Sequence, residues 1–144
     1  MRFIRLTSAA ALLGLWFGGA HVLAHHAFSA EFDANRPVRF QGTVTKVEWI
    51  NPHSWFHIEV KKSDGTVEKW MIEAGNPHNL FRRGFTKDII KPGMLIAVDG
   101  YASKDGSRRA NGRDLTLPGG KTLFMGSSGT GAPLDGRDPA EPPK

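Results

Sequence analysis

Apolar and polar residues alternate along much of the chain between residues 40 and 125, and this pattern predicts β-strands. Residues 40–50 are rich in β-branched and aromatic side chains. Residues 55–60 alternate strictly, which places successive side chains on opposite faces of a strand. One face carries Phe56, Ile58 and Val60. The other carries Trp55, His57 and Glu59, and Trp55 is predicted to point outward.

Turn-forming residues divide the rest of this region into further elements. Ser63-Asp64-Gly65 predicts a hairpin that leads into a third strand. Asn76 and Pro77 suit the N-cap and first position of a short helix, and Gly84 suits its end. The strands expected around this helix cover residues 67–74, 94–101 and 110–117, with a short additional strand at 121–125.

The order of three strands, a short helix and two strands is that of the OB-fold, a five-stranded, partly open barrel. Gly42 fits this fold because the first strand of such a barrel must bend sharply to serve both halves of the sheet. We therefore expect a mainly β protein, an OB-fold-like barrel with a helix between strands three and four. The alternative is another small antiparallel barrel or sandwich.

The first 24 residues have the features of a cleavable secretory signal. Arg2 and Arg5 give a positive start, residues 6–20 are apolar, and Val22-Leu23-Ala24 offers a cleavage site. The apolar stretch is shorter than the roughly 20 residues of a membrane-spanning helix, and no second stretch follows. We therefore expect a periplasmic or secreted protein without a transmembrane segment after cleavage. The remainder divides into an N-terminal arm at 25–39, the barrel at 40–125 and a disordered tail at 126–144.

Composition narrows the chemistry that this chain can carry. It contains no cysteine, which excludes disulfides, thiolate metal sites and thiol catalysis. The formal net charge is +5, and loss of Arg2 and Arg5 with the signal lowers it to +3 (5 − 2). Such a modest charge, in an exported protein, argues against nucleic acid as a partner. A ligand or a partner in the cell envelope is expected instead.

Short distinctive segments are spread over nearly the whole chain after residue 24. They are HHAFSAEFD at 25–33, GTVTKVEW at 42–49, NPH at 51–53, RRG at 82–84, KPG at 91–93, DGY at 99–101 and the run at 104–117. In these segments the chain resembles a bacterial family of small exported proteins of unknown function. The resemblance implies a periplasmic or secreted location and an OB-like barrel. It implies no activity, and no catalytic residue comes with it.

Histidines are the candidate metal ligands. Cleavage after Ala24 would make His25 the N-terminus, where its amine and imidazole can chelate one ion together, as copper prefers. His53, in a loop between strands, is the expected third ligand, with His26 and His57 as further candidates. The ion would be divalent, copper before zinc. The alternative is that these histidines are solvated or bond only to their own turns, since none has the spacing of a helical ligand pair.

Aromatic residues suggest a second kind of site. Trp49 and Trp55 flank the loop at residues 51–54, and exposed aromatic rings on an OB-fold can stack on sugars, bases or peptides. The chain would then be a metal-free module that recognises a small molecule, a glycan or a partner protein. A purely structural accessory of the envelope is a third alternative.

Catalysis has no support in the sequence. It contains no G-x-S-x-G, no H-E-x-x-H and no glycine-rich phosphate loop. His57 and Glu59 share a strand face but have no nucleophile beside them. We therefore expect a binding protein and not an enzyme.

Overall fold

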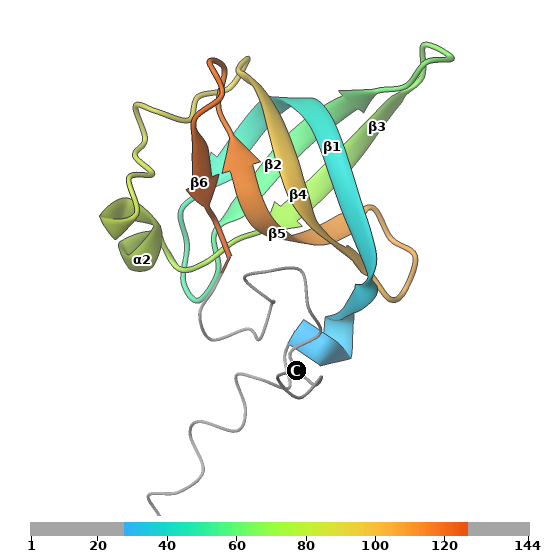
Figure 1. The fold of residues 1–144 in the computed structure, drawn as a ribbon, viewed down its shortest axis with the longest axis horizontal. Coiled ribbons are helices and arrows are strands. Elements are labelled where there is room, and N and C mark those ends of the chain that lie inside the picture. The colour runs from blue at the N-terminus through green and yellow to red at the C-terminus, as the bar shows by residue number, and fades with distance from the viewer. Residues whose placement is uncertain (1–27, 127–144) are drawn as a thin grey trace, which may run out of the picture.

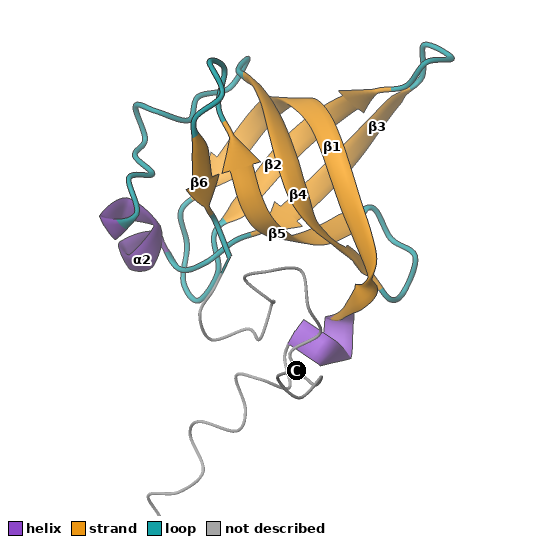
Figure 2. Ribbon diagram, viewed as in Figure 1, coloured by secondary structure: helices purple, strands orange, loops and turns teal. Residues whose placement is uncertain are grey.

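The computed structural model describes residues 28–126, which form a mainly β fold (Figure 1). The expected signal peptide, His25, His26 and nearly all of the expected tail lie outside the described residues. The strands are β1 (Phe32–Glu48), β2 (Trp55–Lys61), β3 (Val67–Glu73), β4 (Leu95–Ser103), β5 (Arg109–Thr116) and β6 (Thr122–Phe124). A helical turn at residues 28–31 precedes β1, and helix α2 (Pro77–Arg82) connects β3 to β4 (Figure 2).

All six strands belong to one sheet with the order β3-β2-β1-β4-β5-β6, in which every neighbouring pair is antiparallel. In addition, β3 pairs with β5 in parallel. This β3–β5 seam consists of Met71 with Arg109, Ile72 with Ala110 and Glu73 with Asn111. The predicted order of three strands, a helix and two strands is confirmed, and β6 falls within the short strand expected at 121–125.

β1 differs from its prediction because it begins at Phe32, inside the segment expected to be an arm. Residues 37–43 pair with β4, and residues 43–48 pair with β2. The pairing with β4 is irregular between Phe32 and Pro37. This irregularity breaks the two-residue period, which is why the alternation of side chains does not reveal the start of the strand.

Gly42 lies where β1 passes from one partner strand to the other, as its predicted role in a bend requires. A Cβ atom built on Gly42 would lie 2.9 Å from the carbonyl oxygen of Glu59 on β2. Real Cβ atoms essentially never approach so closely, so a side chain here would push β1 and β2 apart.

The core lies on one face of the sheet and contains Phe56 and Ile58, both almost fully buried as predicted. Helix α2 adds Leu80 to this core. Asn76 caps the helix by accepting a hydrogen bond from the Asn79 amide at 2.9 Å, as the sequence predicts. Gly84 follows the helix with a φ of 94°, which only glycine adopts readily.

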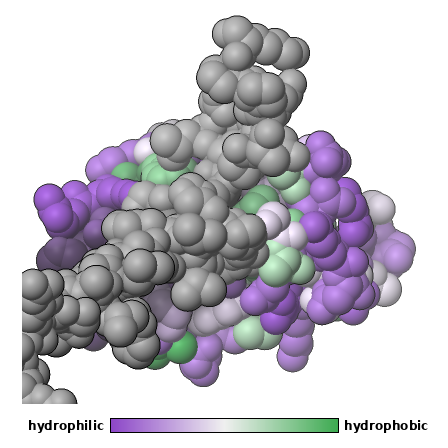
Figure 3. Space-filling view, turned by 90° about the horizontal axis from the view of Figure 1, so that it is seen from below, coloured by the Kyte–Doolittle hydropathy of each residue, from purple (hydrophilic) through white to green (hydrophobic). Residues whose placement is uncertain are grey.

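On one face of the molecule, the described residues that are visible are mainly polar (Figure 3). Viewed from below, hydrophilic side chains dominate this face, and apolar residues occupy small areas between them (Figure 3). Within residues 28–126, no helix combines the length and the apolar character that crossing a membrane demands.

Candidate functional site

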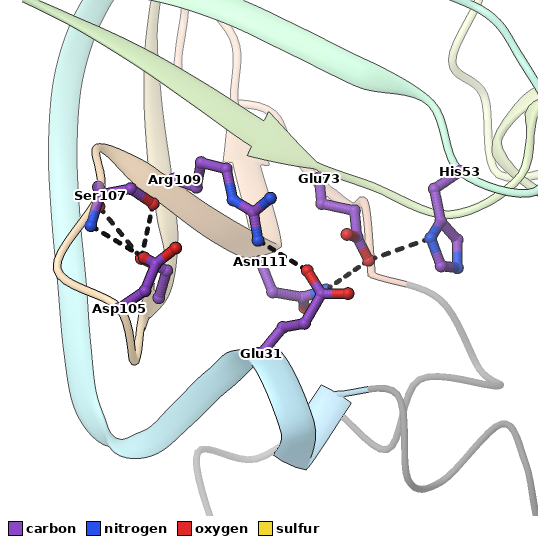
Figure 4. Close-up of polar contacts among 8 residues, drawn as sticks. Glu31, His53, Glu73, Asp105, Ser107, Arg109 and Asn111 are labelled. Carbon is purple, nitrogen blue, oxygen red and sulfur yellow. Dashed lines mark hydrogen bonds and ion pairs between the residues drawn. The ribbon is translucent and has the colours of Figure 1, made fainter.

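Five polar side chains gather at the β3–β5 seam on the face opposite the core. Ile72 and Ala110 pair within the seam and are fully buried in the core. Side chains alternate along a strand, so the next pair, Glu73 and Asn111, projects from the opposite face. The cluster consists of Glu31, His53, Glu73, Arg109 and Asn111 (Figure 4), and is called the seam cluster below.

Glu73 is the central carboxyl of the seam cluster and is only 6% exposed. Its Oε1 lies 3.2 Å from His53 Nδ1 and accepts a hydrogen bond from Asn111 Nδ2 at 3.3 Å. Burial raises the pKa of Glu73 to about 7, and the negative charge of Glu31 acts in the same direction. Arg109 and Asn111 oppose this rise without cancelling it.

His53 is held beside Glu73 by the loop that precedes β2. The Ser54 amide donates to the Gly75 carbonyl at 3.0 Å, and the Ala74 amide donates to the Ser54 carbonyl at 2.9 Å. These bonds fix the loop to the chain immediately after β3. Burial lowers the pKa of His53, which favours the neutral imidazole that can bind a metal.

Glu31 joins the seam cluster from the helical turn at residues 28–31. Arg109 Nη2 donates to Glu31 Oε2 at 2.6 Å, and the Lys104 amide donates to the Glu31 carbonyl at 2.8 Å. Phe28 packs edge-on against Tyr101 of β4, with ring centroids 5.6 Å apart. The N-terminal turn is therefore anchored to the sheet directly beside Glu73.

The seam cluster leaves polar atoms unsatisfied. In residues 28–126, three buried side-chain polar atoms lack a hydrogen-bond partner: Ser54 Oγ, Arg109 Nε and Asn111 Oδ1. Asn111 and Arg109 belong to the cluster, and Ser54 adjoins His53. Unpaired buried polar atoms are costly, and a bound water, ion or ligand commonly satisfies them. These atoms, together with the buried carboxyl of Glu73, single out the cluster as the candidate functional site.

The structure separates the two predicted histidine ligands that it describes. His53 contacts Glu73, whereas His57 Nε2 lies 2.7 Å from Glu48 Oε2 on β1. Within residues 28–126, no three His, Asp or Glu side chains are already arranged around a common metal position.

The two candidate tryptophans have different surroundings. The Trp49 ring packs against Phe56 and Phe81, with centroid distances of 5.7 and 5.0 Å. Trp55 is partly buried on the predicted outward face of β2 and is the register partner of Glu73. Of the two, Trp55 is the one beside the seam cluster.

Glu73 and Asn111 are functional candidates that sequence reasoning missed. Alternation along β3 places Glu73 opposite Ile72, but a glutamate on an outward face is normally solvated. Its burial follows from the pairing of β3 with β5 and from the N-terminal turn, and neither leaves a local pattern in the sequence.

A model for a family of unknown function, DUF6152, matches residues 15–112 of this chain. The match includes all five residues of the seam cluster. No curated protein matches the chain.

Proposed function

We propose that this chain, which belongs to the DUF6152 family of unknown function, is an exported protein that binds a divalent metal ion, copper before zinc. The ligands in this proposal are His53 together with His25 and His26 of the mature N-terminus. The role is binding and not catalysis. The proposed location is the periplasm or the extracellular medium.

In this proposal the domain is an OB-like barrel. Five strands follow the order β3-β2-β1-β4-β5, and the β3–β5 seam joins the first of them to the last. With α2 between β3 and β4, this arrangement supports the OB-fold interpretation. The seam cluster then lies on the outside of the barrel, where the His53 side chain remains 26% exposed.

The observation that carries the metal proposal is the contact between His53 and Glu73. A metal-binding histidine typically donates its other ring N–H to a carboxylate, which fixes the tautomer and orients the ring. His53 Nδ1 lies 3.2 Å from Glu73 Oε1, so a proton on Nδ1 leaves the Nε2 lone pair for the metal. Copper(II) suits nitrogen ligands of this kind.

The anchored N-terminal turn supports the choice of the other ligands. His25 and His26 precede Glu31 by six and five positions, so chain connectivity keeps them within about 20 Å of it. Glu31 itself lies close enough to His53 for its negative charge to act on that imidazole. The proposal therefore takes its other two ligands from the segment that precedes this turn.

Copper titration of the exported protein with its native N-terminus tests this proposal. We expect a mass that begins at His25 and one copper(II) ion per chain with nitrogen ligands, detected by electron paramagnetic resonance. His53→Ala should weaken binding about tenfold or more, because it removes a ligand. His78→Ala is the matched control, since His78 is an exposed histidine on α2.

Each outcome separates the metal proposal from its alternative. Binding should weaken below about pH 6, where imidazoles become protonated. A different N-terminus, or equal binding by wild type and His53→Ala, would contradict the proposal. Recognition of a metal-free ligand through the outer face would then be favoured. That recognition should persist at low pH and fail in Trp55→Ala.

A further inference from the structure

We propose a second metal site on the outer face of β2 and β3, in which His57 and Met71 bind a cuprous ion. These residues lie directly opposite each other in the antiparallel pairing of the two strands. The preceding pair in that register, Phe56 with Ile72, is fully buried in the core. The side chains of His57 and Met71 therefore project together from the opposite face.

The spacing of such a pair suits a shared ion. Cβ atoms of directly opposed residues in an antiparallel sheet are about 4.5–5.5 Å apart. An imidazole nitrogen and a thioether sulfur extending from that distance can reach one ion between them. A cuprous ion accepts linear coordination by two ligands. A thioether ligand favours the cuprous ion over harder metal ions.

His57 is already oriented as a ligand. Its Nε2 lies 2.7 Å from Glu48 Oε2, and Lys46 Nζ donates to the other carboxylate oxygen at 2.5 Å. Lys46 thus holds the Glu48 carboxyl beside the His57 ring. In the tautomer that donates from Nε2 to this carboxyl, Nδ1 of His57 offers its lone pair to a metal.

Met71 is more exposed than the other methionines that the structure describes. It is 37% exposed, whereas Met125 is fully buried and Met94 packs against the core. On its other side Met71 pairs with Arg109, whose guanidinium donates to Glu31 at 2.6 Å. The positive charge of Arg109 is thus balanced by the carboxylate of Glu31, so the Met71 thioether is not beside an unpaired cation.

Trp55 provides a built-in reporter. It lies two positions before His57 on the same face of β2 and is partly buried. A cation bound beside His57 can interact with the electron-rich indole face and quench its fluorescence.

The test is an anaerobic titration of the mature protein with cuprous ion, supplied as its acetonitrile complex, against a coloured cuprous chelator. Met71→Leu keeps the side-chain volume and removes the sulfur, so we expect about tenfold or more weaker cuprous binding. Met94→Leu is the matched control and should bind as wild type does. X-ray absorption of the cuprous complex should show a sulfur neighbour that is lost in Met71→Leu.

Copper(II) titration of the same variants separates this site from the one at His53. We expect Met71→Leu to bind copper(II) as wild type does, and His53→Ala to retain the sulfur-ligated cuprous ion. His57→Gln should lose that ion while keeping its thermal unfolding temperature, because the side chain lies outside the core. Equal cuprous affinity of wild type and Met71→Leu, or no sulfur neighbour in the absorption spectrum, would overturn the proposal.

Discussion

At the scale of single residues, Glu73 and His53 show opposite pKa changes with one physical cause. Burial disfavours charge, so it raises the pKa of the Glu73 carboxyl to about 7 and lowers that of the His53 imidazole. Glu31 adds to the rise at Glu73 because it brings a second negative charge. Each change favours the uncharged form of its group, the protonated carboxyl of Glu73 and the neutral imidazole of His53.

Glu73→Gln should make the protein more stable at pH 8 and leave it nearly unchanged at pH 4. The pKa of Glu73 is raised from 4.5 to about 7 in the folded state. Between pH 4.5 and pH 7 the folded state therefore binds more protons than the unfolded state does. The stability that this group contributes is therefore present below pH 4.5 and lost as the pH rises through 7. Glutamine cannot ionise, and the gain at pH 8 should approach about 3 kcal/mol. Chemical denaturation of wild type and variant across this range measures it.

Glu68→Gln is a control for which the expected pH dependence of stability has the opposite sign. A hydrogen bond from the Trp70 indole and the nearby charges of Lys62 and Arg108 lower the pKa of Glu68. The stability that the Glu68 carboxylate contributes to the fold is therefore present above pH 4.5 and lost as the pH falls. A gain for Glu73→Gln that does not change with pH would refute the assigned ionisation.

The candidate site could be predicted from the sequence only in part. His53, His57 and Trp55 were identifiable because histidines and tryptophans are sparse and chemically distinctive. Glu73 and Asn111 gain their significance by meeting across the seam, 38 positions apart in the chain. Met71 was hidden because a methionine in a strand usually belongs to the core, and only the register with His57 reveals another use.

At the scale of elements, β1 is shared between two partner strands and depends on its bend. Gly42→Ala should lower the free energy of unfolding by about 1–3 kcal/mol, because the new methyl group would meet the Glu59 carbonyl and the Ile58 and Val60 side chains. Gln41→Ala, at the exposed neighbouring position, should change it by less than about 0.5 kcal/mol. Urea unfolding of both variants measures this difference. Equal free energies of unfolding for the two variants would show that β1 can bend without glycine.

The N-terminal turn should detach from the sheet independently of the rest of the fold. Phe28, Phe32 and Tyr101 form an aromatic cluster separate from the main core. Phe28→Ala should therefore speed hydrogen exchange at the Lys104 amide, which donates to the Glu31 carbonyl. Amides that join β2 to β3 should keep their protection. Faster exchange throughout the sheet would instead show that the turn and the sheet unfold together.

At the scale of the whole molecule, local patterns were enough to predict the strands but not how the sheet is completed. Alternating residues, hairpin turns and the Asn76 cap each act within a few positions, so the order of elements was visible in the sequence. Pairing between β3 and β5 depends on how the whole chain returns on itself. The early start of β1 was also hidden, because its irregular pairing removes the alternation.

The short β3–β5 seam has a consequence for motion. Only three residue pairs join the two strands, whereas β2 and β3 are joined by seven. Brief openings of the native state begin where few contacts must break, so the seam, like the equally short β5–β6 pairing, is a place for the sheet to part. Such an opening would separate Glu73 from Asn111 and Met71 from Arg109. In the proposed site an ion is bound by His53 near one side of the seam and by the N-terminal segment near the other. Such an ion would link the two sides of the seam. It would make these local openings slower without altering the average shape of the sheet.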